Sequence, residues 1–390
     1  MSDLISQLAA SARTIPESGI VKLFNYGRNR DGLIALWAGE GETPTSEPIR
    51  AAASAALAEG QTFYTYQRGI PPLREAIAGY MSRLYDRPMQ PEEFFSTIGG
   101  MGAIQICVQM LVGHGNEVVV PGPSWPNFAG AILSRGGVPR FVPMQFGKTG
   151  WTLDLDRLFD ACTERTRALF INSPSNPTGW VASEEELRAI LTFARDRGLW
   201  IIADEIYGRF YYDGDLAPSF QTLREPGDRI LFVQTFSKMW AMTGWRMGWL
   251  QAPPELGQTI ENLIQYNTSG VASFLQPAGT FALTEGDADA RGQIARARTG
   301  RDIVCSAIEP FGNVSFAWPA GAFYLMFGID GVTSSLDTAM RLVDEANIGL
   351  APGSAFGPGG EGYFRICYQR SPAALREAMG RLTAWLEKND

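Results

Sequence analysis

The sequence is poor in histidine and cysteine, and this scarcity excludes several kinds of site. One histidine, His114, occurs among the 390 residues, in a turn-like Gly-His-Gly-Asn segment, and we interpret it as a loop residue. Neither a Ser-His-Asp triad nor a histidine-based metal site is therefore expected. The four cysteines, Cys107, Cys162, Cys305 and Cys367, form no CxxC pair. We expect no disulfide framework and no metal, and a reducing, cytoplasmic location fits best.

Long apolar runs and clusters of basic residues are missing as well. No run of about 18 uninterrupted apolar residues occurs, so the sequence predicts no transmembrane helix and no membrane partner. The N-terminus lacks a basic segment followed by an apolar one, so we expect no signal peptide. The formal net charge is −8 without any lysine and arginine cluster, which argues against nucleic acid as a partner.

Short apolar runs alternate with segments of helical period along the first two thirds of the chain. Buried strands are predicted over 117–120, 168–171, 199–203 and 230–233, and a capping box at Ser183 and Glu186 predicts a helix to Arg197. This alternation predicts an α/β fold with a mostly parallel, doubly wound sheet, in which ligands bind beyond the carboxyl ends of the strands.

The C-terminal third has a different pattern. Strands are predicted over 321–327 and 362–368, and Ser371 and Pro372 begin a final helix to about Lys388. We expect a smaller α+β domain formed by the N- and C-terminal segments. Our predicted division is 1–45 as an N-terminal segment packing on the small domain, 46–275 as the large domain and 276–390 as the small C-terminal domain.

A lysine and an acid follow two of the predicted strands. Lys238 comes shortly after the strand over 230–233, where partial desolvation would lower the pKa of its amine and suit Schiff-base chemistry. Asp204 ends the strand over 199–203, where a buried carboxylate needs a cation such as a protonated pyridine nitrogen. A solvated surface lysine and a strand-end acid that caps the next segment are the simpler alternatives.

Three further segments lie at the same predicted edge of the sheet. Asn176, in Asn-Pro-Thr-Gly, could donate a hydrogen bond to a phenolate oxygen, although the segment also reads as a plain turn. Glycines 99 and 100 precede a helix pattern and could hold a phosphate, aided by Thr235, Ser237 and Arg246. Trp125 could stack on a planar cofactor or simply belong to the core.

These elements occur in one order, which ends with Ser237, Lys238 and, after seven residues, Arg246. The ordered set resembles the fold-type I, class I and II aminotransferases of the aspartate aminotransferase superfamily. The resemblance extends from about residue 30 to residue 370. It implies a pyridoxal 5′-phosphate cofactor, held as an internal aldimine by Lys238 in the large domain.

The resemblance also implies a role for each matching residue. Asp204 would pair with the pyridine nitrogen, Asn176 and Tyr207 would bond the phenolic oxygen, and Trp125 would stack on the ring. The implied phosphate ligands are Gly100, the Met101 backbone, Thr235, Ser237 and Arg246. Arg365 and the Gly39 backbone would bind the substrate α-carboxylate, with Trp125 and Asn176 also facing the substrate. Tyr64 would reach the phosphate of the partner subunit in a homodimer.

The implied reaction moves an amino group from an L-amino acid to a 2-oxo acid by a ping-pong mechanism, with Lys238 transferring the proton. Some aspartate aminotransferases of this family have lysine at the position of Met101 and threonine near that of Gly19. Met101 binds no carboxylate, and Trp37, Tyr64, Trp125 and Phe356 could form an aromatic-rich pocket. We therefore favour a neutral or aromatic donor over aspartate.

Two other functions compete with this hypothesis. Carbon–sulfur β-lyases and related pyridoxal-phosphate enzymes share this scaffold and the residues Lys238, Asp204 and Arg246, so these residues do not separate the activities. A non-catalytic module, such as the aminotransferase-like half of a transcription regulator, would need a DNA-binding domain. The N-terminal stretch is too short for one and has no basic helix-turn-helix pattern.

Overall fold

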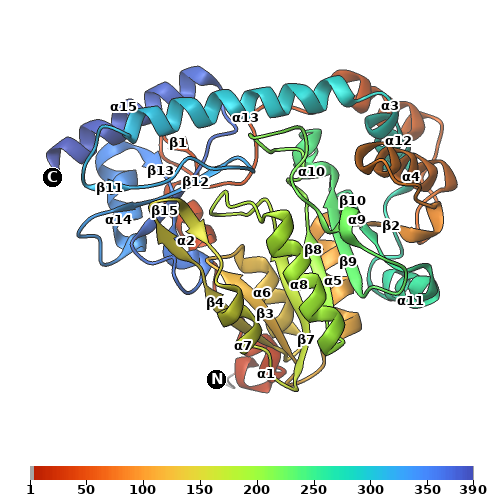
Figure 1. The fold of residues 1–390 in the computed structure, drawn as a ribbon. Helices are drawn as coiled ribbons and strands as arrows, with labels where there is room; N and C mark the ends of the chain where they lie inside the picture. The colour runs from red at the N-terminus through yellow and green to blue at the C-terminus, as the bar shows by residue number, and fades with distance from the viewer. Residues whose placement is uncertain (1–3, 390) are drawn as a thin grey trace.

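The structure, a computed structural model, describes residues 4–389 of the chain. A seven-stranded sheet forms its centre (Figure 1). In spatial order its strands are β2 (Phe94–Thr97), β10 (Gly248–Gln251), β9 (Ile230–Thr235), β8 (Trp200–Asp204), β7 (Thr166–Asn172), β3 (Glu117–Gly122) and β4 (Val138–Pro143). β10 is antiparallel to both neighbours and all other neighbouring pairs are parallel. The predicted α/β class is confirmed, whereas β2 and β10 were not predicted.

Helices cover both faces of this sheet because successive strand residues point to opposite sides. Val118 and Val120 pack into one apolar cluster and Val119 into the other. The first cluster includes residues of α5 (Gly99–Leu111), α6 (Pro126–Ser134) and α11 (Gly257–Asn267). The second includes residues of α7 (Leu155–Asp160) and α8 (Glu184–Arg197). The sheet is thus buried between two helix layers, which explains its nearly continuous apolar strands.

The predicted capping box sets the start of α8. The Ser183 hydroxyl accepts from the Glu186 N–H at 3.1 Å, and the Glu186 carboxylate accepts from the Ser183 N–H at 2.7 Å. Gly198 ends the helix in the left-handed region, with φ of 63°. The chain then turns directly into β8, whose last residue is Asp204.

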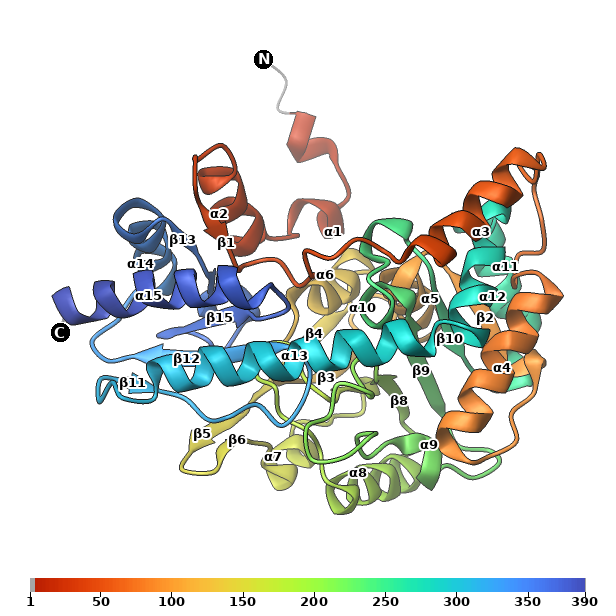
Figure 2. The same ribbon diagram turned by 90° about the horizontal axis from the view of Figure 1, so that it is seen from above.

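A second, antiparallel sheet belongs to the C-terminal third. Its order is β11 (Val314–Ser315), β12 (Tyr324–Ile329), β15 (Tyr363–Cys367) and β14 (Ala351–Pro352). Beside it lie α14 (Ser335–Arg341) and α15 (Pro372–Lys388), the latter starting where Ser371 and Pro372 predicted. The 22-residue helix α13 (Asp287–Ile308) runs from α12 (Gln276–Thr284) to α15 (Figures 1 and 2).

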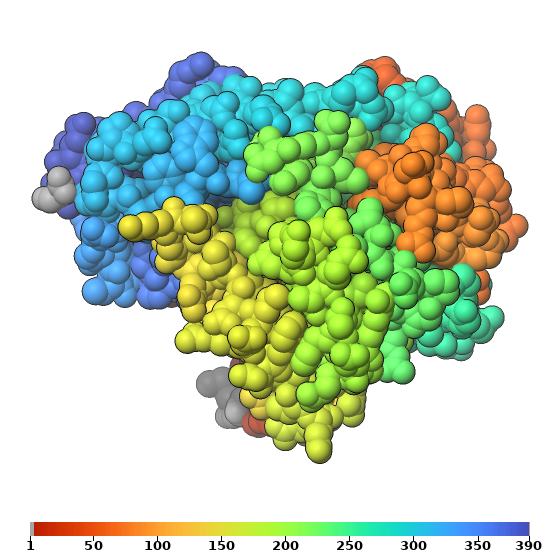
Figure 3. All heavy atoms as spheres, viewed as in Figure 1, coloured from red at the N-terminus to blue at the C-terminus, as the bar shows by residue number. Residues whose placement is uncertain are grey.

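The N-terminal segment lies against C-terminal elements. After α1 (Ala10–Arg13), α2 (Gly19–Gly27) packs on α14 and β14, and β1 (Ile34–Ala35) pairs in parallel with β13 (Ile348–Gly349) (Figure 2). The domain division at residues 45 and 275 stays a prediction. Figure 3 shows the blue C-terminal part resting directly against the yellow and green central part.

Further helices and one hairpin connect these parts of the chain. They are α3 (Glu47–Ala58), α4 (Pro71–Tyr85), α9 (Phe220–Leu223), α10 (Phe236–Met239) and the hairpin of β5 (Gln145–Gly147) and β6 (Gly150–Thr152). None of the helices within residues 4–389 combines the length and apolar character needed to cross a bilayer.

Candidate active site

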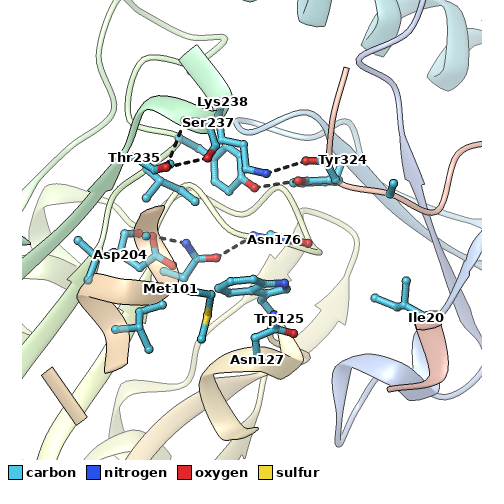
Figure 4. A pocket seen from close by; sticks show the side chains of 18 of the residues that line it. Ile20, Met101, Trp125, Asn127, Asn176, Asp204, Thr235, Ser237, Lys238 and Tyr324 are labelled. Atoms are coloured by element: carbon cyan, nitrogen blue, oxygen red, sulfur yellow. Dashed lines mark hydrogen bonds between the residues drawn. The ribbon is translucent and has the colours of Figure 1, made fainter. Parts of the chain in front are cut away.

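A cavity of about 320 Å³ lies beyond the carboxyl ends of β7, β8 and β9 (Figure 4). Twelve of the residues predicted from the sequence line it: Gly39, Gly100, Met101, Trp125, Asn176, Asp204, Tyr207, Thr235, Ser237, Lys238, Arg246 and Arg365. Tyr64 does not line it, and its side chain is 91% exposed. The fold therefore gathers segments separated by more than 300 positions into one site.

Lys238 projects into the cavity from α10, which follows β9 directly. The Thr235 hydroxyl caps this short helix by accepting from the Ser237 N–H at 3.1 Å. The Lys238 amine donates to the carbonyl oxygen of Gly39 at 2.7 Å. Burial lowers its pKa from 10.5 to about 8, with Arg365 and Arg246 adding to the decrease. About a tenth of the amine is therefore neutral and nucleophilic at pH 7, far more than the ordinary lysine pKa of 10.5 would allow.

Asp204 ends β8 next to Asn172, the last residue of β7. The Asn172 amide donates to the Asp204 carbonyl oxygen at 3.0 Å and fixes this pair of strand ends. The Asp204 side chain is buried, and its Oδ1 has no hydrogen-bond partner among the described residues. Burial raises the pKa of this carboxyl to about 7. A buried carboxylate oxygen without a partner is costly, so the site fits a ligand that supplies a cationic donor there.

The first turn of α5 faces Thr235 and Arg246. Gly99 begins this 13-residue helix with φ of +66°, and a Cβ atom there would lie 2.5 Å from Nη2 of Arg246. The Thr235 hydroxyl lies 2.9 Å from that of Ser237, and Arg246 donates to the Thr243 carbonyl at 2.7 Å. A helix N-terminus, two hydroxyls and one guanidinium are the donors that a phosphate monoester needs.

Arg365 enters the cavity from β15. It is buried, and its Nη1 donates to the Asn176 side-chain oxygen at 2.9 Å. Its Nη2 donates to the Trp37 carbonyl, and its Nε has no partner among residues 4–389. A guanidinium so buried, with a donor left over, is suited to a carboxylate ligand.

Sequence reasoning missed Tyr324, the first residue of β12. Its hydroxyl lies 2.7 Å from the Tyr207 hydroxyl inside the cavity wall (Figure 4). The sequence offered one general signal for this residue. A tyrosine in a strand that is expected to be buried needs a hydrogen-bond partner for its hydroxyl. Asn172, whose amide donates to the Asp204 carbonyl oxygen, was not among the residues predicted for the site.

The outer wall of the cavity is apolar or neutral. Ile20 of α2 lies across the cavity from Met101 and Trp125, which stand together with Asn127 (Figure 4). Trp37, Ile104 and Val21 are among the other apolar lining residues, and Ser18 adds a hydroxyl. Among the described lining residues, the charged ones are Asp204, Lys238, Arg246 and Arg365. Phe356, predicted for this pocket, instead packs against Arg365, with its ring centre 5.0 Å from the guanidinium carbon.

Comparison with known proteins places this geometry in a family. A family profile described as aminotransferase class I and II matches residues 32–382. The chain belongs to the class I and II aminotransferases. This match confirms the predicted resemblance. Enzymes of this family depend on pyridoxal phosphate.

Several relatives match this aminotransferase over nearly their full length. A putative aminotransferase of Bacillus subtilis, YugH, is 34% identical and aligns over 99% of this chain and 100% of its own. Aromatic-amino-acid aminotransferase 2 of Thermococcus litoralis is 34% identical, over 95% and 96% of the two chains.

Solved structures agree with this fold. The aspartate aminotransferase of Thermotoga maritima superimposes with a TM-score of 0.91 at 30% identity, covering 97% of this chain and 100% of that one. An aromatic aminotransferase of Pyrococcus horikoshii OT3 gives 0.87 at 32% identity, over 94% and 99%. Relatives with different donors are thus about equally similar to this aminotransferase, so overall similarity does not select its donor.

Proposed function

We propose that this protein is a pyridoxal-phosphate-dependent aminotransferase that moves an amino group from a neutral or aromatic L-amino acid to a 2-oxo acid by a ping-pong mechanism. The observation that supports it best is the buried Asp204 carboxylate oxygen, which has no hydrogen-bond partner within residues 4–389 and shares a cavity with the Lys238 amine. The two groups match the two ends of one cofactor ring: a pyridine nitrogen and an aldehyde carbon. The phosphate donors around Gly99 supply a third point of attachment.

Each residue around the cavity has a task in this proposal. Lys238 attaches the cofactor covalently, and its released amine then takes the α-proton of the substrate and returns it. Asp204 keeps a proton on the ring nitrogen, and the bound cofactor supplies the electron sink that makes this proton transfer feasible. Asn176 and Tyr207 donate to the ring oxygen and Trp125 covers the ring face.

Binding of the other groups is divided between two regions of the cavity. Gly100, the Met101 backbone, Thr235, Ser237 and Arg246 hold the phosphate. Arg365 and the Gly39 backbone hold the substrate carboxylate, with Trp125 and Asn176 beside it. Because Arg365 and Arg246 are thereby engaged, the described residues of the outer wall offer no further cation for a distal carboxylate. Ile20, Met101 and Ile104 favour an apolar side chain there.

We also propose a homodimer in which Tyr64 reaches the phosphate in the partner's site. Tyr64 stands beside Phe63 and Tyr66, whose side chains are 81% and 63% exposed, and such a group of exposed aromatics is typical of an interface. Mixing two inactive variants, Lys238→Ala and Tyr64→Ala, tests it. A mixed dimer would regain one complete site, so activity returning on subunit exchange supports the proposal and its absence contradicts it.

The function itself is tested with the purified protein and pyridoxal phosphate. Borohydride reduction should fix the cofactor to Lys238, as located by peptide mass spectrometry. Single L-amino acids should then discharge the visible absorbance of the bound cofactor, and a 2-oxo acid should restore it. The matched control is Lys238→Ala. Release of pyruvate and ammonia from cystathionine without any acceptor would instead identify a β-lyase.

A further inference from the structure

Tyr324 contacts both ends of the catalytic site through different parts of one side chain. Its hydroxyl oxygen lies 2.7 Å from that of Tyr207, the residue proposed to face the cofactor. Its ring centre lies 4.6 Å from the guanidinium carbon of Arg365, the residue proposed to face the substrate carboxylate.

The hydroxyl pair has a defined hydrogen-bonding capacity. Both tyrosines are fully buried, and burial raises the pKa of each hydroxyl well above its ordinary value, so both stay protonated. Two neutral hydroxyls at this distance form one hydrogen bond. The tyrosine that accepts this bond can donate its own hydrogen to another partner. If Tyr324 donates, the Tyr207 hydrogen is free to point into the cavity.

The ring of Tyr324 has a separate role. The Arg365 guanidinium lies between two aromatic rings, Tyr324 at 4.6 Å and Phe356 at 5.0 Å. These faces stabilise the cation without using the donors that a carboxylate would need. Gly39 leaves room for the arrangement, because a Cβ atom at that position would lie 2.5 Å from the Tyr324 hydroxyl oxygen.

We propose that Tyr324 is a positioning residue for both half-sites. Its hydroxyl donates to Tyr207 and directs the Tyr207 hydrogen toward the ring oxygen of the cofactor, while its ring holds Arg365 in place for the substrate carboxylate. The inference rests on the proposed function, because the two residues it positions receive their partners from that function.

Three variants of the holoenzyme separate the two contacts. Tyr324→Phe removes only the hydroxyl, Phe356→Leu removes only the other aromatic face of Arg365, and Tyr324→Leu removes a hydroxyl and a face together. The measurements are a pH titration of the lysine-bound cofactor's absorbance, and kcat and KM for the best amino acid. Thermal melting checks that each variant is folded.

Tyr324→Phe should raise the apparent pKa of the bound chromophore by up to about one unit, because weaker donation to the ring oxygen disfavours the deprotonated form. It should lower kcat and leave KM within about twofold. Phe356→Leu should raise KM several-fold and leave the titration unchanged, in line with about 0.5–1 kcal/mol for a cation–aromatic contact. Tyr324→Leu should show both effects.

A wild-type titration and kcat in Tyr324→Phe would overturn the positioning of Tyr207. An unchanged KM in both leucine variants would overturn the positioning of Arg365. Either result, with a normal chromophore in the wild-type enzyme, leaves the proposed function standing. A wild-type protein that forms no lysine-bound chromophore would overturn the proposed function and this inference with it.

Discussion

The amine of Lys238 donates to the carbonyl oxygen of Gly39 at 2.7 Å, although the two residues are 199 positions apart. The loop that contains Gly39 thus contacts α10, the short helix that follows β9, at the cavity. This carbonyl oxygen gives the amine a hydrogen-bond partner within the cavity.

The lowered pKa of Lys238 makes the rate of cofactor attachment depend on pH. The neutral amine is the nucleophile, and its fraction rises through a pKa of about 8. We expect the rate of recombination of apoenzyme with pyridoxal phosphate to rise with pH and to level off above about pH 8, as measured by stopped-flow absorbance. A rate that keeps rising toward the ordinary lysine pKa of 10.5 would contradict the desolvated environment.

Asp204→Asn should stabilise the apoprotein at alkaline pH. The folded pKa of Asp204 is raised from 3.8 to about 7, so the folded state holds a proton that the unfolded state loses between these values. Stability is therefore highest at low pH and falls as the pH rises to about 7, by up to about 4 kcal/mol at this site. Urea unfolding of the wild type and of Asp204→Asn at pH 5 and pH 8 measures this change in the free energy of unfolding.

The neighbouring Glu205 provides an internal comparison for that experiment. Its pKa is also raised by burial to about 7, so part of the pH dependence should persist in Asp204→Asn. Pyridoxal phosphate should reduce the wild-type loss, because a cationic ring nitrogen would pair with Asp204. Equal pH dependence in wild type and variant would mean that Asp204 is solvated in the apoprotein.

Arg365→Ala should weaken substrate binding through the carboxylate alone. Hydrogen bonds to a charged group contribute about 1.5–3 kcal/mol, so KM for the L-amino acid should rise about 10- to 150-fold. Arg365→Lys should recover only part of this loss, since an ammonium group cannot make the bidentate pair of hydrogen bonds that a guanidinium makes with a carboxylate. The matched control is the decarboxylated amine of the same substrate, whose slow half-reaction should be unaffected. A similar loss with that amine would mean that Arg365 acts on a part of the substrate or cofactor other than the substrate carboxylate.

Met101→Lys should shift donor preference toward aspartate. A cation would then join an outer wall whose nearby lining residues are apolar or neutral, and a distal carboxylate would gain a partner. We expect kcat/KM for aspartate, relative to phenylalanine, to rise at least about tenfold, the effect of roughly 1.4 kcal/mol. Met101→Leu preserves the apolar wall and should leave the ratio near that of the wild type. An unchanged kcat/KM ratio in Met101→Lys would mean that Met101 does not determine donor specificity.

Gly99→Ala should weaken cofactor binding, whereas Gly102→Ala should not. Gly99 has φ of +66°, and a Cβ there would lie 2.5 Å from Arg246. The backbone strain alone costs about 1–2 kcal/mol, and moving Arg246 would remove a phosphate donor. At Gly102 the nearest atom would be 3.5 Å away, an ordinary contact. Equilibrium dialysis of pyridoxal phosphate compares the two, and equal affinities would mean that Arg246 does not face the phosphate.

The sequence alone determined the sheet layer and the order of the site segments. Alternating apolar runs predicted β3, β7, β8 and β9 because buried parallel strands need nearly continuous apolar residues. Asp204 and Lys238 were identifiable because a polar group directly after such a strand lies at the ligand-binding edge. The strands β2 and β10 were not predicted, since only two of the four residues in each are apolar and the sequence does not show which neighbours complete a sheet.

Tertiary structure alone decided how the outer parts of the site meet. Tyr324 lies 117 positions from Tyr207, and nothing in an apolar strand reveals which hydroxyl its own will face. The bond between Lys238 and Gly39 and the contact of Phe356 with Arg365 likewise depend on how the terminal segments pack against the central sheet. Local patterns determine which residues end a strand, because strand and helix periods are local, whereas long-range packing determines which side chains share a cavity.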